Sequence, residues 1–428
     1  MAIEQVDVLV IGAGPAGTVA AAIINKAGYK VKIVEKEQFP RFVIGESLLP
    51  KCMDPLEEAG FLPAIQAQGY QEKFGAKFIN AQQDVMDFNF AHQFTKGWTW
   101  TWQVPRADFD HTLAKEVERM GVDIAYRTAV TNIVFDGTAS TTTVVADNVA
   151  YQIQAKFIVD GSGYGRVIPR LFGLERQSNL PPRKTLFTHI KDIRREHYAE
   201  PNRILIVDHQ PGVWIWCIPF SNGNTSCGFV GNPEFFETLS GSPEEQMRTL
   251  IAADSNIAER FAGCEFVFEP RMIQSWSATS DRFYGDGYVL TGNVTEFLDP
   301  IFSSGVTLAT VSAQRAAHLV IKHLQGAVVN WEEEYTKPTM IGVNAFRAYV
   351  MAWYDGSLQK IFFNATQIPN VVEQICSVLA GYVWDTNNPF VKDAEANVRR
   401  LVRMIDVKNK IDNLEEDEHT VVVTLRKP

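Results

Sequence analysis

The residues best suited to chemistry are glycines that follow the first apolar segment of the chain, residues 6–11. They stand in a G-x-G-x-x-G pattern made of Gly12, Gly14, Pro15, Ala16 and Gly17. In such a turn the first glycine makes the tight bend, the second lets the backbone approach a pyrophosphate, and the third lets a helix pack on the strand. Free N–H groups at the start of that helix bind phosphate. The pattern therefore predicts a dinucleotide site at residues 12–17.

The flanking segments supply the structural context that this motif needs. Residues 18–27 are apolar and rich in alanine, as expected of a buried crossover helix, and Val31–Val34 predicts a second strand. Glu35 follows that strand directly, where an acid accepts hydrogen bonds from a ribose, and Lys36 comes next. The alternative is a strand–helix–strand unit without a ligand, and the completeness of the pattern argues against it.

Residues 39–50 predict an ordered loop rather than a strand, because Pro40 and Pro50 bracket it. The loop carries Arg41, Gly45, Glu46 and Ser47. Arg41 and Glu46 are charges in apolar surroundings, so they need partners. A polar cofactor could supply these partners, or the two side chains could form an ion pair with each other at the surface.

The strand-then-glycine pattern occurs twice more along the chain. It places Asp160, Gly161, Gly292 and Asn293 directly after the short strands expected near residues 157–159 and 288–290. Three such turns, far apart in sequence, predict one nucleotide-binding domain assembled from separate segments. Arg106, at the start of an expected helix, could reach a phosphate of the same ligand.

Between the second and third of these turns the sequence has a different pattern of residue types. Short β-rich runs separated by turn residues occupy residues 185–276 and predict an antiparallel sheet, a floor for a substrate pocket. A helix from residue 243 to about 262, with Ser242 as its N-cap, interrupts the sheet. After Gly305 the pattern is helical, and we interpret its many aromatic residues as core packing, with an aromatic roof over a substrate as the alternative.

We therefore expect an α/β fold with three parts. The first is a Rossmann-like nucleotide domain, discontinuous over residues 1–180 and 281–330, with inserted strands at 75–105. The second is an antiparallel-sheet substrate domain at 181–280, and the third is a helical C-terminal cap at 331–428.

The bulk composition excludes some classes of function. The 428 residues include 40 basic and 50 acidic side chains, a formal net charge of −10, which argues against nucleic acid as a partner. The five cysteines are not at metal-ligand spacing, so we expect no metal, and their small number fits a reducing cytoplasm. No apolar run is long enough to span a bilayer, and the first strand begins too early for a signal peptide, so we expect a cytoplasmic protein without a transmembrane segment.

The order of these motifs is that of FAD-dependent aromatic hydroxylase-fold flavoproteins, and the segment W-x-W-x-I-P at 214–219 narrows the resemblance. Over residues 5–325 the chain resembles the flavin-dependent halogenases. The resemblance implies FAD as the cofactor and places Trp214 and Trp216 against the flavin, where they keep substrate away from its peroxide. The similar run at 98–105 precedes the helix that begins near Arg106, where this fold has an ordinary strand, so we do not assign it this role.

The resemblance also implies the remaining catalytic residues. Lys73 matches the catalytic lysine of the family, with Lys77 as a neighbour. Pro300, Ser304 and Gly305 match the loop at the flavin edge, where Ser304 and Gly305 are the candidates for binding halide. In the implied reaction, reduced FAD and O₂ give a flavin C4a-hydroperoxide, halide attacks it to form hypohalous acid, and the lysine presents the halogen to an electron-rich carbon.

One departure from the family concerns the substrate. Tryptophan halogenases carry a glutamate where this chain has Phe302. The pattern is therefore closer to halogenases of phenols and pyrroles, some of which act on substrates tethered to carrier proteins, and it implies halide and a separate flavin reductase as partners. The alternatives are a non-halogenating FAD-dependent monooxygenase or prenyl double-bond reductase of the same fold, and an FAD-binding protein without turnover.

Overall fold

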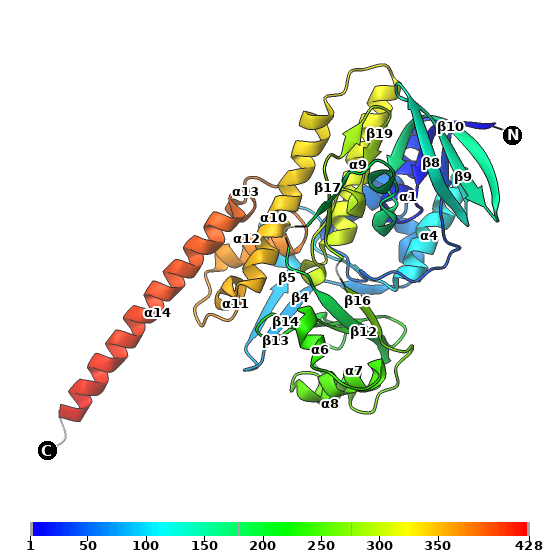
Figure 1. Cartoon of the computed structure of the whole chain (residues 1–428). Helices are drawn as coiled ribbons and strands as arrows, with labels where there is room; N and C mark the ends of the chain where they lie inside the picture. Colours follow the sequence, from blue (N-terminus) through cyan, green and yellow to red (C-terminus); the bar gives the residue numbers. More distant parts are fainter. Residues whose placement is uncertain (1–2, 179, 275, 426–428) are drawn as a thin grey trace.

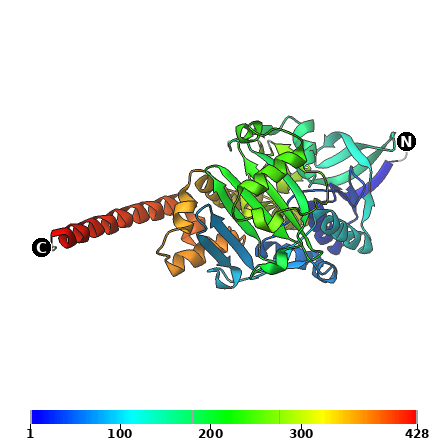
Figure 2. The same ribbon diagram turned by 90° about the horizontal axis from the view of Figure 1, so that it is seen from below.

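The structure, a computed structural model, describes residues 3–178, 180–274 and 276–425. Two large sheets form the body of the molecule, and helices pack on their faces (Figure 1). Helices from the C-terminal part of the chain pack against one end of this body, and the last of them projects away from it (Figures 1 and 2).

The first sheet is parallel at its centre, as a dinucleotide-binding fold requires. Its order is β18-β19-β10-β1-β2-β7, and β8 and β9 extend it beside β10. The strands are Ile3–Ile11 (β1), Val31–Val34 (β2), Asp123–Ala125 (β7), Thr128–Asp136 (β8), Ala139–Ala146 (β9), Val149–Asp160 (β10), Tyr284–Gly285 (β18) and Tyr288–Leu290 (β19). The parallel pairs β1–β10 and β10–β19 join distant parts of the chain and confirm the discontinuous Rossmann-like arrangement.

Burial on both faces explains why β1 is a nearly continuous apolar run. Val8 and Val10 pack against the helices on one face, which are Pro15–Lys26 (α1), Arg106–Arg119 (α4) and Ser304–Leu324 (α9). Leu9 and Ile11 point the other way, because successive side chains alternate, and pack with residues of β8 and β9.

The second sheet has the order β16-β12-β15-β14-β13-β4-β5. Its strands are Gly75–Asn80 (β4), Val85–Asn89 (β5), Lys184–Lys191 (β12), Leu205–Gln210 (β13), Val213–Pro219 (β14), Asn224–Gly231 (β15) and Arg271–Gln274 (β16). The sheet between residues 185 and 276 is thus confirmed as antiparallel. It also includes β4 and β5, which we expected within the nucleotide domain, because β13 pairs in parallel with β4 along its free edge.

Alternation along β14 sends its side chains to two different environments. Trp214 and Trp216 face the core that the C-terminal helices complete, whereas Ile215 and Cys217 face the opposite side of the sheet. That opposite side is covered by Pro233–Glu237 (α6), Pro243–Ala253 (α7) and Ala258–Phe261 (α8). A Cβ on Gly228, the register partner of Trp216, would lie 2.3 Å from its Cζ2 atom, so the indole needs a glycine beneath it.

The helix expected over residues 243–262 is correct at its start and wrong at its end. Ser242 forms a capping box with Glu245, as its position predicts. The helix ends at Ala253 because Asp254 adopts an extended backbone. The Asp254 carboxylate instead pairs with His209 Nδ1 at 2.7 Å and accepts the N–H of Asn256. A separate short helix, α8, follows.

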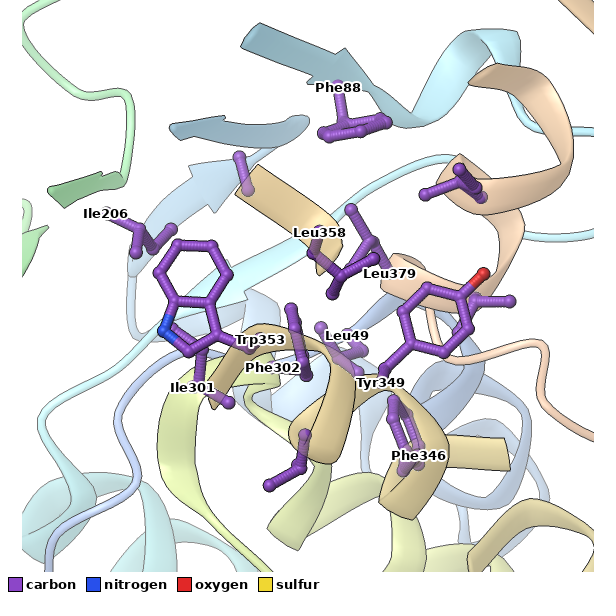
Figure 3. Close-up of a cluster of buried hydrophobic side chains, with 14 of the residues drawn as sticks. Leu49, Phe88, Ile206, Ile301, Phe302, Phe346, Tyr349, Trp353, Leu358 and Leu379 are labelled. Atoms are coloured by element: carbon purple, nitrogen blue, oxygen red, sulfur yellow. The ribbon is translucent and has the colours of Figure 1, made fainter. Parts of the chain in front are cut away.

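The C-terminal region is helical, as expected. Its helices are Lys337–Tyr354 (α10), Ser357–Phe362 (α11), Pro369–Leu379 (α12), Pro389–Lys392 (α13) and Ala394–Leu425 (α14). Figure 3 shows Phe346, Tyr349 and Trp353 of α10 packed with Phe302 and with Leu49, and all five side chains are buried. The interpretation of these aromatic residues as core is therefore confirmed. Within the described residues no helix combines the length and apolar character needed to cross a membrane.

Short elements connect these parts and position the site. They are Met53–Ala59 (α2), Leu62–Ala67 (α3), Gln71–Lys73 (β3), Thr101–Gln103 (β6), Val167–Leu171 (α5), Glu175–Gln177 (β11), Ala278–Ser280 (β17) and Glu296–Phe297 (β20). β3 and β6 form a two-stranded ribbon that sets Lys73 opposite Thr101. A single 3-10 turn, Pro300–Phe302, precedes α9.

Candidate active site

A cavity of ≈ 530 Å³ lies where the glycine turns of the first sheet meet the inner face of the second. Of the residues proposed from sequence, it is lined by Gly12, Gly14, Pro15, Ala16, Glu35, Lys36, Arg41, Gly45, Glu46, Ser47, Arg106, Gly161, Trp214, Trp216, Asn293, Pro300 and Gly305. The structure thus brings together segments that are almost 300 residues apart in the chain. One part of the lining is polar and charged, and the part from the second sheet is mostly apolar.

The glycine turns are packed so closely that larger residues would not fit. Gly12 has a φ of +94°, and a Cβ there would lie 2.8 Å from the carbonyl oxygen of Gly161. A Cβ on Gly17 would lie 1.9 Å from the carbonyl oxygen of Gly12, so Gly17 serves the packing of α1 and does not itself line the cavity. Glu35 lines the cavity and accepts the N–H of Ala13 at 2.8 Å. This cradle, with an acid at its edge, fits the pyrophosphate and ribose of FAD.

Two arginines at the cavity share one buried carboxylate. Asp110 is fully buried and accepts two hydrogen bonds from Arg106, at 2.8 and 3.0 Å, and one from Arg41 at 3.0 Å. Arg41 Nε is 4.0 Å from Glu35. One carboxylate therefore orients two guanidinium groups that both line the cavity, an arrangement suited to an anionic ligand such as a phosphate.

The loop charges Arg41 and Glu46 do not pair with each other, so that alternative is wrong. Glu46, only 2% exposed, pairs with His189 Nε2 of β12 at 2.7 Å. Its partner thus comes from the second sheet, more than 140 positions along the chain, where no local pattern could predict it. The pair ties the loop at residues 39–50 to the inner face of that sheet.

Four proposed binding residues lie just outside the cavity lining, and they support it from behind. They are Gly17, which serves the packing of α1, and Asp160, Gly292 and Ser304. The fully buried Asp160 accepts the N–H groups of Ser162 and Ile168 and so shapes the turn at Gly161, and burial raises its pKa. The Gly292 N–H bonds to Ser312, and the Ser304 side chain is buried while its neighbours Ser303 and Gly305 line the cavity.

Lys73 lies immediately behind the cavity wall. It is 3% exposed, and its Nζ donates to Ser47 Oγ and to the Leu48 carbonyl, both at 2.8 Å. Ser47 lines the cavity, and on another side Nζ is 5.4 Å from the centre of the Phe90 ring, which belongs to the apolar core beneath the C-terminal helices. Burial, with a smaller contribution from Arg203, lowers the pKa of Lys73 from 10.5 to about 7.

Trp214 and Trp216 form part of the cavity wall, with their ring centres 5.9 Å apart. Both are buried, and both indole N–H groups have partners, Tyr354 for Trp214 and Ser226 for Trp216. Hydrogen bonds and the packing on Gly228 therefore hold both rings in fixed orientations.

Sequence reasoning missed several residues of the site. Thr185 and Trp276 line the cavity, and Asp110 holds the two arginines. Asp110 stands four residues after Arg106 on one helix, a spacing that predicts an ion pair and could have found it. Thr185 could have been found from the alternation of β12 only if the register with its neighbouring strands had been known.

Comparison with known proteins agrees with this geometry. A family described as FAD binding domain matches residues 5–331. A 1H-pyrrole-2-carbonyl-(peptidyl-carrier protein) brominase of Pseudoalteromonas luteoviolacea is 27% identical over 388 residues, which cover 89% of this chain and 93% of that protein. Among solved structures, a flavoprotein/dehydrogenase of Cytophaga hutchinsonii is 56% identical, with a TM-score of 0.93 over 95% of this chain and 100% of the other. A flavin-dependent brominase has a TM-score of 0.82 at 26% identity over 94% of this chain and 100% of the other. The chain therefore belongs to the FAD-binding domain family, as an FAD-dependent oxidoreductase similar to the flavin-dependent halogenases.

Proposed function

We propose that the protein is an FADH₂- and O₂-dependent halogenase of an electron-rich aromatic substrate of the phenol or pyrrole type. When bound, reduced FAD supplies with O₂ the oxidant that converts a halide ion into hypohalous acid. The protein's own residues bind the cofactor, keep the substrate from its reactive face, and hold the amine that presents the halogen.

The observation that carries this proposal is the position of Lys73. Its Nζ lies 2.8 Å from Ser47, a residue of the cavity wall, yet it is shielded from bulk water at 3% exposure. With a pKa of about 7, both protonation states are populated near neutral pH. The ammonium can donate a hydrogen bond to hypohalous acid, and the neutral amine can form a haloamine. A hydroxylase needs neither.

The tryptophan wall supports the same reaction. Trp214 and Trp216 contribute bulky, immobilised rings to the apolar part of the cavity. An organic substrate beside the flavin would have to displace them. We therefore infer that the oxidised halogen, and not the substrate, passes between the cavity and Lys73.

The residue type at position 302 supports a phenol or pyrrole as the substrate. The Phe302 ring packs edge-on against Tyr349 and Trp353, with ring centres 6.0 and 6.3 Å away (Figure 3). This side chain cannot take a proton from a substrate ring, as a glutamate could. A phenol or pyrrole ring is activated by its own heteroatom, so it needs such a base less.

The proposal includes three partners. A halide ion would bind near Gly305, which lines the cavity at the start of α9. A separate reductase would supply reduced flavin, since the sequence contains no second G-x-G-x-x-G unit for a nicotinamide cofactor. Because a relative acts on a pyrrole bound to a peptidyl carrier protein, a carrier-tethered substrate is proposed beside free aromatics.

The decisive test supplies reduced FAD, O₂ and bromide with two substrate panels. One panel contains free phenols and pyrroles, and the other contains phenol- and pyrrole-carboxylic acids loaded on a carrier protein. Mass spectrometry then looks for the isotope doublet of bromine. Brominated product that depends on both FADH₂ and bromide supports the proposal. Hydroxylated product without bromine would favour a monooxygenase. In a parallel reaction with a prenylated substrate, reduction of its double bond would favour the reductase alternative.

A matched pair of variants tests the role of the lysine. Lys73→Ala should abolish bromination while FAD binding and peroxide release continue. Lys77→Ala removes a lysine from the neighbouring strand, where the side chain pairs with Glu200 outside the cavity, and should leave bromination intact. Loss of FAD binding in Lys73→Ala would show that this lysine has a structural role instead.

A further inference from the structure

Tyr354, the last residue of α10, lies behind the cavity and makes two hydrogen bonds there. The Trp214 indole Nε1 donates to the Tyr354 hydroxyl at 3.1 Å, and this hydroxyl donates to Asp299 Oδ2 at 3.0 Å. The other carboxylate oxygen, Oδ1, accepts the N–H of Ile301 at 3.0 Å. A continuous chain of hydrogen bonds therefore joins the tryptophan wall to the turn Pro300–Phe302.

The chemistry of these groups fixes the direction of every hydrogen bond in the chain. An indole N–H can only donate, and so can a backbone N–H. The single hydroxyl hydrogen of Tyr354 must therefore point to Asp299, because its oxygen accepts from Trp214. The carboxylate then accepts at both ends. Burial raises the pKa of Asp299 to about 6, so at neutral pH the carboxylate is ionised and this arrangement of hydrogens satisfies all four groups.

The two ends of this chain belong to different segments of the cavity lining. Trp214 comes from β14 of the second sheet, and Pro300 and Ile301 come from the turn that precedes α9. The Tyr354 ring is itself held in place, because the Arg183 guanidinium carbon stacks 3.7 Å from the ring centre. A residue outside the cavity, on a C-terminal helix, thus sets the spacing between two of its walls.

We propose that Tyr354 is a positioning residue that holds the Trp214 indole and the turn Pro300–Phe302 at a fixed separation. This role rests on the proposed function, in which that separation decides whether the oxidising equivalent from reduced FAD and O₂ reaches halide, for transfer as halogen, or is released as hydrogen peroxide. Tyr354 touches neither wall's inner surface and acts only through Trp214 and Asp299.

The test replaces Tyr354 by phenylalanine, which keeps the ring on Arg183 and removes both hydrogen bonds. Tyr382→Phe is the matched control: Tyr382 is a buried tyrosine of the C-terminal region, its hydroxyl donates to the Trp98 carbonyl at 3.0 Å, and it lies outside the cavity lining. Both variants lose a hydrogen-bonded hydroxyl, so a lower melting temperature in both reports only a loss of stability.

Three measurements separate positioning from stability. In Tyr354→Phe we expect an altered visible circular dichroism of bound oxidised FAD and an FAD affinity within about threefold of wild type. The halogenated yield per FADH₂ should be about tenfold lower, with more free peroxide, a size that fits the loss of two hydrogen bonds of modest net strength. Tyr382→Phe should leave the dichroism and the yield unchanged. Wild-type dichroism and wild-type yield in Tyr354→Phe would overturn the proposal.

A double-mutant cycle provides an independent readout. Trp214→Phe removes the indole N–H, so Tyr354→Phe should add far less to the change in FAD dichroism in that background than in wild type. Additive effects would contradict a shared chain of hydrogen bonds. If wild type halogenates no substrate, the proposed function fails, while the dichroism and the non-additivity still decide the role of Tyr354.

Discussion

Replacing Lys73 by methionine should change how the stability of the protein depends on pH. The side chain is 3% exposed, and burial lowers its pKa from 10.5 to about 7. Methionine keeps the length of the side chain and removes the titrating amine. In the unfolded chain the lysine regains its ordinary pKa, so between pH 7 and pH 10.5 the unfolded state binds more protons than the folded state. Stability must then rise with pH across this window.

The size of the effect follows from the two pKa values. The lysine destabilises the folded wild type by about 4 kcal/mol at pH 7 and by about 2 kcal/mol at pH 9, relative to an amine with an unperturbed pKa. For a chain of 428 residues, an unfolding entropy of about 2.1 cal/mol/K per residue converts the difference of about 2 kcal/mol into about 2–3 °C of melting temperature.

The assay is calorimetry of the wild type and of Lys73→Met at pH 7, 8 and 9. The melting temperature of the wild type should rise relative to the variant by about 2–3 °C between pH 7 and pH 9. Lys77→Met is the control, because Lys77 is paired with Glu200 nearer the surface. A plot of its melting temperature against pH should run parallel to that of the wild type. If the plots of melting temperature against pH are also parallel for Lys73→Met and wild type, the reasoning is refuted, because the Lys73 amine then titrates alike in the folded and the unfolded chain.

Three further substitutions test other parts of the structure. Gly228→Ala should displace the Trp216 indole, whose nearest ring atom would be 2.3 Å from the new Cβ, and should lower stability by about 1–3 kcal/mol in thermal melts. Asp110→Asn should weaken FAD binding about tenfold in fluorescence titrations, because the carboxylate that orients both cavity arginines is lost. Tyr349→Phe should be neutral or raise stability by up to about 1 kcal/mol in thermal melts, because this buried hydroxyl has no partner among the described residues.

Local patterns predicted those parts of the fold that local geometry dictates. The glycine turn at 12–17 needs a positive φ at Gly12 and no side chain at Gly17, and only glycine meets both requirements. The capping box at Ser242 is equally local, since its two hydrogen bonds lie within four residues. Such features can be read from a single sequence because the residues that satisfy them are neighbours in the chain.

Features that depend on distant partners were not predictable in the same way. Because β4 pairs in parallel with β13, β4 and β5 belong to the second sheet, whereas we expected them within the nucleotide domain. Glu46 pairs with His189, and the Trp214 indole donates a hydrogen bond to Tyr354, and both partners lie far along the chain. Each polar group signalled that it needed a partner once buried, but the choice depends on how the sheets and helices pack, which side-chain periodicity does not specify.

The two tryptophan-rich runs of this chain show that spacing alone does not determine a role. The first run has a tryptophan at every second residue, Trp98, Trp100 and Trp102, as the second has at Trp214 and Trp216. Its successive rings pack edge-to-face, with ring centres 6.0 Å apart for the first pair and 5.0 Å apart for the second. The strand in this run, β6, has three residues, of which only Trp102 is a tryptophan, and pairs only with β3 among the described strands. The three tryptophans of the run lie outside the described cavity lining. β14 is instead flanked by β13 and β15, and β15 supplies Gly228, where the absence of a side chain lets the Trp216 indole approach the backbone closely. The sheet in which the strand is embedded, and not the W-x-W spacing, therefore turns an alternating pair of aromatics into a wall of the cavity.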